Sequence, residues 1–338
     1  KQVFGYSHLR EGQLEAVEAY LKNKDTFVSI KTGGGKTFCY IICALIFESI
    51  TIVISPLKAL MEDQKAKLMH LGIPCASIYA NTVQSRNEQG KIFEEIALGF
   101  TKIIFVTPEK LCLNREFQHF ISNMYNTAKV RFVIDEAHCI LDYSNFRESW
   151  KKLGILKKNW PLAPIMFLTA TCTYQDAQDI HTSLGIPSEN FAMIRGSSFE
   201  RKEITIEVYK RKDNRELFSN DLMSLIKMHE GGKTIIYCAT QSGCDDLFAI
   251  LQLLLPDKNI GIYHGGLGDE QRESIMSCWK NGKIQIMIGT NAFGMGINST
   301  DVYLVIHCVA PLNMTNLVQQ IGRAGRDGNE AKSIIFYS

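Results

Sequence analysis

Short runs of apolar residues alternate with amphipathic stretches along the chain. Short runs that are apolar at nearly every position are typical of strands buried on both faces of a sheet, and the stretches between them are typical of covering helices. In the first half the predicted strands are Phe27–Ile30, Thr51–Ile54, Ala76–Tyr79, Ile103–Val106, Phe132–Ile134 and Ile165–Leu168. In the second half they are Thr234–Cys238, Ile260–Tyr263, Ile284–Ile288, Val302–Ile306 and Ser333–Tyr337. The pattern predicts an α/β fold in which parallel strands are joined by helices.

A polar segment with small residues, Arg195–Lys202, separates the two series of strands and predicts a hinge. With 338 residues the chain is long enough for two domains that each have a core. We therefore predict a first domain over residues 1–200 and a second over residues 201–338. Because the chain begins at Lys1 and not at Met, we expect it to be an excised core of a longer protein.

Composition narrows the class of protein only slightly. A content of 46% hydrophobic and 21% charged residues excludes wholesale disorder. The formal net charge of +2 neither requires nor excludes a nucleic-acid partner, because a binding groove needs only local basicity. The basic cluster of Lys151, Lys152, Lys157 and Lys158 is interpreted as a solvated helix face rather than a DNA contact.

The cysteines and the hydropathy pattern indicate the compartment. The chain has ten cysteines but no Cys-x-x-Cys pair, so we predict no zinc site and a reducing intracellular environment. No apolar run reaches the length of a membrane span, and no signal peptide opens the chain. We expect no membrane partner, and a location in the nucleus for a eukaryotic source or in the cytoplasm otherwise.

A glycine-rich segment follows the first predicted strand and comprises Thr32, Gly33, Gly34, Gly35, Lys36 and Thr37. Consecutive glycines between a strand and a helix let backbone N–H groups surround a phosphate, and the helix adds its positive N-terminal end. Lys36 is suited to reach the β- and γ-phosphates of ATP, and the Thr37 hydroxyl is suited to bind Mg²⁺. The strict phosphate-loop pattern has glycine where Ile30 stands, so only Gly35–Thr37 matches it, and a glycine-rich turn is the alternative.

Two adjacent acids, Asp135 and Glu136, close the predicted strand Phe132–Ile134. The carboxyl ends of parallel strands are where open α/β sheets bind their ligands. Asp135 is suited to hold Mg²⁺, and Glu136 is suited to orient and deprotonate an attacking water. The alternative is that both acids only begin a helix, where they suit its dipole.

Two arginines three residues apart, Arg323 and Arg326, follow Gln319 near the C-terminus. Guanidinium groups stabilise the negative charge of a phosphoryl group in transfer, and from a distant segment they would couple hydrolysis to closure of the site. A solvated basic turn is the alternative for this segment taken alone. Together the three segments predict an ATP and Mg²⁺ site that closes between two lobes.

These segments resemble superfamily 2 helicases and, in more detail, the RecQ family. The matching segments are Phe4–Gln13, Ser55–Leu57, Met61–Gln64, Thr107–Glu109, Asp135–His138, Leu168–Thr171, Tyr263–Leu267, Ala292–Ile297 and Gly322–Gly328. The resemblance covers essentially the whole chain. It implies two tandem RecA-like domains, each a mostly parallel sheet flanked by helices.

The resemblance also implies roles for individual residues. Tyr6 would stack on the adenine base, Arg10 and Gln13 would bond its edge, and Gln319 would belong to the ATP site. Residues assigned to DNA contact or to coupling are Ser55, Thr107, Phe146, Arg147 and Thr290. For Thr107, a helix-capping or turn threonine before Pro108 is an equally ordinary interpretation.

The chain departs from the RecQ pattern at several places. The loop Tyr143–Arg147 is shorter than usual and lacks a tryptophan, while Phe146 and Arg147 keep groups that could stack on a base and touch phosphate. Single departures are Glu11, Lys31, Asn298 and Gln320, the last standing in place of an acid. The zinc-binding and winged-helix domains of the family are expected to be absent, since the chain ends at Ser338.

The implied activity is ATP-driven movement, 3′ to 5′, along single-stranded DNA, with separation of duplex DNA in repair and recombination. The implied partners are single-stranded DNA and duplex junctions, and no protein partner is indicated. Two alternatives stay open. One is an RNA-dependent ATPase of the same superfamily, and the other is a helicase-like scaffold that binds nucleic acid with weak or uncoupled ATP hydrolysis.

Overall fold

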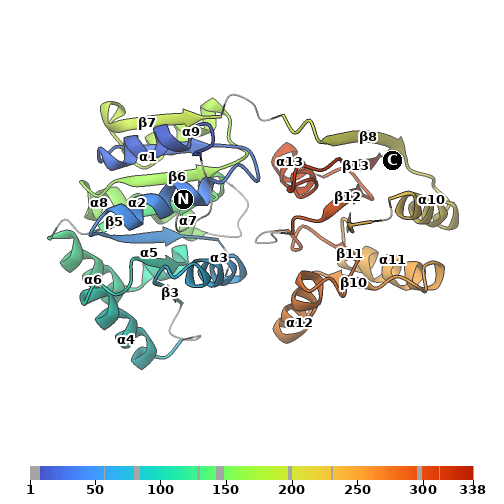
Figure 1. The fold of residues 1–338 in the computed structure, drawn as a ribbon, viewed down its shortest axis with the longest axis horizontal. Coiled ribbons are helices and arrows are strands. Elements are labelled where there is room, and N and C mark those ends of the chain that lie inside the picture. Colours follow the sequence, from blue (N-terminus) through green and yellow to red (C-terminus); the bar gives the residue numbers. More distant parts are fainter. Residues whose placement is uncertain are drawn as a thin grey trace. The chain divides into compact units, whose positions relative to one another are not determined.

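The computed structural model describes residues 8–56, 58–79, 84–127, 130–141, 148–196, 200–229, 231–294, 299–311 and 313–337. The chain divides into two compact units, Lys1–Phe199 and Glu200–Ser338. In each unit helices flank a central sheet (Figure 1). Among the described residues, no helix is both long and apolar enough to cross a membrane.

The sheet of the first unit is parallel throughout its described strands. In sequence these are β1 (Asp25–Ser29), β2 (Ile50–Ile54), β3 (Cys75–Ile78), β4 (Ile103–Val106), β5 (Val130–Asp135), β6 (Ile165–Thr169) and β7 (Phe191–Arg195). Their order across the sheet is β3-β4-β2-β5-β6-β1-β7. Since every neighbouring pair is parallel, the carboxyl ends of all these strands lie along one edge.

Helices cover both faces of this sheet. One face packs against α1 (Gln13–Leu21), α2 (Lys36–Ile46) and α3 (Lys58–His70). The other packs against α4 (Arg86–Ala97), α5 (Pro108–Leu113), α6 (Arg115–Tyr125), α7 (Glu148–Lys151), α8 (Ile155–Asn159) and α9 (Tyr174–Ser183). Successive strand residues serve opposite faces, so Phe132 and Ile134 join one core while Val133 joins the other. Burial on both faces explains why these strands are continuous apolar runs.

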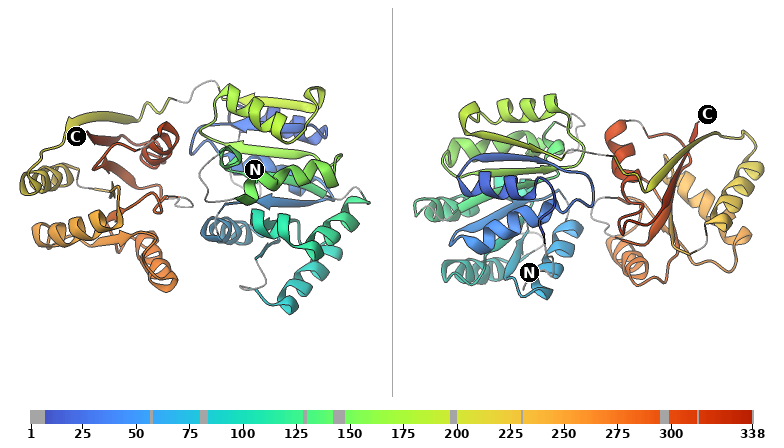
Figure 2. Two further views of the ribbon diagram at one scale, coloured as in Figure 1. Left: turned by 180° about the vertical axis from the view of Figure 1, so that it is seen from behind. Right: turned by 45° about the horizontal axis from the view of Figure 1, so that its top comes forward.

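The second unit repeats the plan with a smaller parallel sheet (Figure 2). Its described strands are β8 (Ile204–Lys210), β9 (Lys233–Tyr237), β10 (Ile260–Tyr263), β11 (Ile286–Gly289), β12 (Val302–His307) and β13 (Ala331–Tyr337), in the order β10-β11-β9-β12-β13-β8. Helices α10 (Arg215–Met228) and α11 (Gln241–Leu254) cover one face. Helices α12 (Asp269–Lys280) and α13 (Met314–Ile321) contribute Trp279, Leu317 and Ile321 to the core on the other.

The predicted fold class is confirmed, but two strands were missed. Both β7 and β8 lie at sheet edges, where one side of the strand has no partner. Residues of β7 are only partly buried, and β8 leaves Ile206 and Val208 more than half exposed. In β8 apolar residues alternate with polar ones, as an edge strand allows. In β7 the run Phe191–Ile194 is apolar, so this strand was overlooked although its pattern was visible. The predicted hinge Arg195–Lys202 begins at the last residue of β7 and ends before β8, and its residues 197–199 lie outside the described residues.

One interpretation of the lysine cluster was wrong. Lys151, Lys152 and Lys158 are exposed, but the Lys157 side chain is only 8% exposed and lies 2.7 Å from the Asp25 carboxylate. Asp25 is fully buried at the start of β1, and it also accepts a hydrogen bond from the Ile165 backbone N–H of β6. The pair therefore joins α8 to two central strands.

Replacing Asp25 with Ala should strongly destabilise the first unit, because Lys157 would keep a buried charge without its partner. We expect a loss of about 3–5 kcal/mol in the free energy of unfolding. Urea unfolding followed by the fluorescence of Trp150 and Trp160 would measure it. As a control in the same unit, Glu148→Gln breaks the exposed pair with Lys152 and should cost at most about 0.5 kcal/mol. Equal small effects of both changes would contradict a structural role for the buried pair.

Candidate nucleotide site at the carboxyl ends of the strands

The segment between β1 and α2 has the geometry of a phosphate loop. Gly33 and Gly35 adopt left-handed backbone angles, with φ of 77° and 82°. A Cβ atom on Gly34 would lie 2.4 Å from Cγ2 of Ile30 and 2.9 Å from the Lys31 carbonyl oxygen. Side chains are therefore excluded at the loop for two separate reasons, strain and crowding. Helix α2 begins directly after the loop at Lys36, so its N-terminal N–H groups and the loop can serve one anion.

Lys36 lies between the loop and the acidic strand end. Its Nζ donates to the Ile30 carbonyl oxygen at 3.1 Å. Its charge also lowers the pKa of Asp135, so the two groups are near enough to interact electrostatically. The next residue is Thr37, in the first turn of α2.

Two residues predicted to bind adenine contact the loop in this structure. Arg10 Nη1 donates to the Gly33 carbonyl oxygen at 2.6 Å. The buried Gln13 side chain donates from Nε2 to the carbonyl oxygens of Gly34 and Gly35, at 3.2 and 3.1 Å, and its Oε1 accepts from the Arg10 N–H at 2.8 Å. Arg10 and Gln13 thus brace the phosphate loop. Their contact with a base stays a prediction, and Tyr6 lies outside the described residues.

The two acids occupy different environments at the end of β5. Asp135 is buried as the last residue of the strand, whereas Glu136 follows it with a left-handed φ of 54°. Such a backbone angle is uncommon for a residue other than glycine and is enriched at functional sites. Glu136 Oε2 lies 3.4 Å from Nδ1 of His138, and that nitrogen lies 3.2 Å from the Thr169 hydroxyl of β6.

A buried hydrogen-bond relay holds Asp135. Gln64 of α3 donates from Nε2 to Asp135 Oδ2 at 2.9 Å, and its Oε1 accepts from the Tyr40 hydroxyl of α2 at 2.7 Å. Sequence reasoning included Gln64 in a matching segment but gave it no role. Gln64 lies three residues after the buried Met61 and four before the buried Leu68, and this helical spacing was the available signal.

Burial raises the pKa of Asp135 to about 6, and the neighbouring Glu136 charge contributes in the same direction. The Gln64 hydrogen bond and the Lys36 charge oppose that rise without cancelling it. A buried carboxylate whose charge is incompletely compensated would be stabilised by a cation. Asp135 and Thr37 offer oxygen donors of the type that Mg²⁺ prefers, so the residues present fit that ion.

Of the residues predicted to contact DNA, the structure describes Ser55, Thr107 and Thr290, and the two threonines make local hydrogen bonds. Ser55 is fully buried, and its hydroxyl has no hydrogen-bond partner among the described residues. The Thr107 hydroxyl caps α5 by accepting from the Lys110 N–H at 3.3 Å. The Thr290 hydroxyl accepts from the Ala292 N–H at 3.3 Å. Phe146 and Arg147, also predicted to contact DNA or to couple it to hydrolysis, and the departure Asn298 lie outside the described residues.

The second unit carries the predicted arginines just after α13. Arg323 is 7% exposed, and Arg326 donates from Nε to the Gly322 carbonyl oxygen at 3.3 Å. Gly325 has a left-handed φ of 60°, and a Cβ there would lie 3.0 Å from the Asn329 carbonyl oxygen. The turn therefore requires glycine for both conformation and space. Gln319 lies in the last turn of α13.

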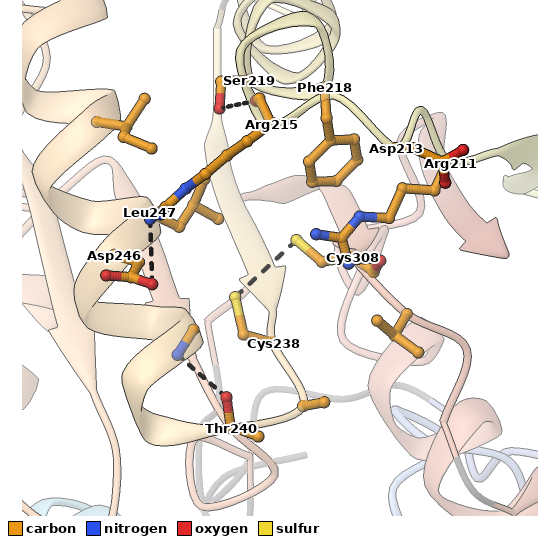
Figure 3. Close-up of a pocket in the computed structure, with 14 residues that line it drawn as sticks. Arg211, Asp213, Arg215, Phe218, Ser219, Cys238, Thr240, Asp246, Leu247 and Cys308 are labelled. Atoms are coloured by element: carbon orange, nitrogen blue, oxygen red, sulfur yellow. Dashed lines mark hydrogen bonds and ion pairs between the residues drawn. The ribbon is translucent and has the colours of Figure 1, made fainter. Parts of the chain in front are cut away.

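The second unit contains a cavity of about 350 Å³ that the sequence analysis did not predict (Figure 3). It opens where β9 and β12 end, beside the Thr240 cap of α11. The Arg211 guanidinium lies over the Phe218 ring, and the sulfur atoms of Cys238 and Cys308 are 3.9 Å apart. None of the residues that were predicted to form a site lines this cavity.

Comparisons with known proteins agree with the two-unit architecture. A match to the DEAD/DEAH box helicase family covers residues 10–180, and a match to the helicase conserved C-terminal domain covers residues 218–328. The chain is 38% identical to the ATP-dependent DNA helicase RecQ of Pasteurella multocida (strain Pm70) and 35% identical to the RecQ-like DNA helicase BLM of Xenopus laevis. Each alignment covers 99% of this chain, with 51% of the first relative and 24% of the second. The chain thus spans about half or less of the length of these relatives.

A solved structure shares the fold at low sequence identity. The helicase MrfA bound to DNA aligns with a TM-score of 0.81 and 19% identity, covering 99% of this chain and 49% of that one. At this identity the likeness concerns the fold alone.

Replacing Asp135 with Asn should stabilise the ligand-free protein near neutral pH. The folded-state pKa of about 6 exceeds the ordinary value for aspartate of about 3.9, so folding must bury a charge above about pH 6, and this cost disappears as the pH falls toward 4. We expect Asp135→Asn to raise the free energy of unfolding by about 1–3 kcal/mol at about pH 7.5, and by much less near pH 4. Urea unfolding in EDTA at both pH values would measure this. A variant that is less stable at the higher pH would contradict the assigned environment.

Proposed function

Because the chain belongs to the DEAD/DEAH box helicases, and within them to the RecQ helicases, we propose that it is an ATP-dependent DNA helicase core. The observation that carries the proposal is the grouping in the first unit of a braced phosphate loop, Lys36 and the buried Asp135. This grouping lies at the sheet edge where α/β proteins bind nucleotides.

In the proposed site the phosphate loop and α2 bind the phosphates of ATP. Thr32, Gly33, Gly34 and Gly35 supply the loop, and Lys36 exchanges its contact with the Ile30 carbonyl for the β- and γ-phosphates. Thr37 and Asp135 would hold Mg²⁺, which when bound supplies positive charge beside the phosphates. Tyr6, Arg10 and Gln13 are assigned to the base side, with Gln13 also bracing the loop.

Glu136 is the proposed general base. Its backbone is left-handed, its side chain is 32% exposed, and its Oε2 lies 3.4 Å from Nδ1 of His138, whereas Asp135 belongs to the buried relay. The partly exposed carboxylate of Glu136 can orient a water and take its proton, while the buried carboxylate of Asp135 holds the cation. The division of roles between the two acids thus follows from burial.

We assign Arg323 and Arg326 to stabilising charge on the phosphoryl group in transfer, with Gln319 beside them. Arginine suits this role because its guanidinium is always charged and offers several donors in a plane. The glycine-dependent turn that carries Arg326 supports the assignment, since it holds the backbone in one conformation.

For the nucleic acid we propose single-stranded DNA and duplex junctions, with 3′ to 5′ movement and strand separation in repair and recombination. The segments at Thr107 and Thr290 present small hydroxyls and turn N–H groups, which suit contacts to phosphates without reading sequence. Ser55 is buried, so its part would be to hold its segment in place. Phe146 and Arg147 are proposed to couple DNA to hydrolysis. The proposed location is the nucleus for a eukaryotic source and the cytoplasm otherwise.

Steady-state ATP hydrolysis with and without single-stranded DNA tests the proposal, with Lys36→Ala as the blank. We expect DNA to raise turnover at least about 10-fold, and Lys36→Ala to lose at least about 100-fold, because the phosphates lose their charge partner. An RNA oligonucleotide of the same length is the matched control and should stimulate less.

Stimulation by RNA in place of DNA would identify an RNA-dependent ATPase. Binding of DNA with no rise in turnover would identify an uncoupled scaffold. Either result would contradict the proposed function.

A further inference from the structure

A buried polar network lies beneath the arginine turn of the second unit. The fully buried His307, at the end of β12, approaches Gln320 of α13, with 2.9 Å between Nε2 and Oε1. Gln320 is 4% exposed, and its Nε2 donates to Asn291 Oδ1 at 2.6 Å. Asn291 itself is exposed, in the loop that follows β11. Gln320 therefore connects the core of the unit to a surface loop.

The network is neutral and directional. An amide oxygen can only accept, so His307 Nε2 must carry the proton that binds Gln320 Oε1. Burial lowers the pKa of His307 to about 4, which keeps the ring uncharged at neutral pH. Its ring stacks on that of Tyr237 from β9, with centroids 5.4 Å apart. Both ends of the Gln320 amide are thus used, and its orientation is set by a rigid partner.

The loop that Asn291 belongs to is firmly attached at its other end. We call residues 290–294 the Thr290 loop. Phe293 is fully buried and packs against Tyr263 and Trp279. The Phe293 N–H also donates to the Thr290 carbonyl oxygen at 2.8 Å. A shift at one point of this short loop is therefore transmitted to the rest of it.

Arg323 contacts the same loop. A Cβ atom on Gly294 would lie 2.8 Å from Arg323 Nη2, so the guanidinium packs directly against the loop backbone. The Arg323 N–H in turn donates to the Gln320 carbonyl oxygen at 3.2 Å. Arg323 and Gln320 are three residues apart, and both contact the Thr290 loop. Arg323 contacts it at Gly294, and Gln320 contacts it at Asn291.

We propose that Gln320 is a positioning residue that couples the Thr290 loop to Arg323. Nucleic acid bound at the loop would then fix the alignment of Arg323, and stimulation of ATP hydrolysis would pass through the bond between Gln320 and Asn291. This inference rests on the proposed function, which assigns Thr290 to DNA and Arg323 to the nucleotide. A purely structural network would stabilise the fold without affecting stimulation.

Two substitutions in the whole chain test the coupling. Asn291→Ala removes the outer bond at an exposed position, and Gln320→Leu removes both bonds. We expect each to lower the DNA-saturated kcat about 10-fold, because Arg323 is misaligned, while the Kd for a fluorescent single-stranded oligonucleotide stays within about two-fold. The double variant should be no worse than Gln320→Leu alone, since both act on one connection.

Matched controls separate coupling from packing. Glutamate at this position can accept from His307 Nε2 and, once the Asn291 amide rotates, from Asn291 Nδ2. Gln320→Glu should therefore retain most of the stimulation by DNA. Gln252→Leu places the same substitution at an exposed site on α11 and should change nothing. Wild-type kcat in Asn291→Ala, or equal losses of kcat and DNA affinity in every variant, would overturn the proposal.

Hydrogen–deuterium exchange gives a readout that does not depend on ATP hydrolysis. Asn291→Ala should speed exchange in peptides that contain Thr290–Gly294 and leave β12 unchanged. Unchanged exchange in the loop would overturn the inference, whatever the activity of the protein. If the wild-type chain is not stimulated by DNA but the loop still responds, the proposed function fails and the physical connection stands.

Discussion

The burial of one carboxylate, Asp135, is the constraint on which the first unit depends. Its position at the end of a central parallel strand removes it from water, and a hydrogen bond from Gln64 and the Lys36 charge offset only part of the cost. Such a site is less stable without a cation than it would be with a neutral residue. The phosphate loop is held beside it by Gln13 and by glycines that no side chain could replace. The incompletely compensated carboxylate lowers the stability of the ligand-free protein, and the same carboxylate is suited to bind a cation.

In the second unit a buried charged side chain, Arg323, lies beside uncharged groups. Its network of His307, Gln320 and Asn291 is neutral, and each buried member is connected to another. This arrangement can hold Arg323 in a defined position without being altered by pH in the neutral range. The two units therefore differ in the surroundings of their charged side chains, Asp135 in the first and Arg323 in the second. The first leaves a carboxylate incompletely compensated, and the second holds an arginine through uncharged partners.

Much of this could be predicted from sequence, for identifiable reasons. Central strands are buried on both faces, so runs such as Thr51–Ile54 were visible as apolar segments, whereas the edge strand β8 alternates apolar and polar residues and was not. Gly33–Lys36 and Asp135 were recognisable because their chemistry is local in the chain. The relay of Tyr40, Gln64 and Asp135 was not, since it joins residues that meet only after folding. The same holds for the ion pair between Asp25 and Lys157, and for the bracing of the loop by Gln13.

The most direct test of the account is the separation of nucleotide binding from hydrolysis in Glu136→Gln. If Asp135 holds the cation and Glu136 only activates water, this variant should bind Mg²⁺ and a fluorescent ATP analogue with a Kd within about two-fold of wild type. Its DNA-stimulated kcat should fall at least about 100-fold, because the general base is lost. Hydrolysis near the wild-type rate would contradict the assigned chemistry. Loss of nucleotide binding together with hydrolysis would contradict the division of roles between the two acids.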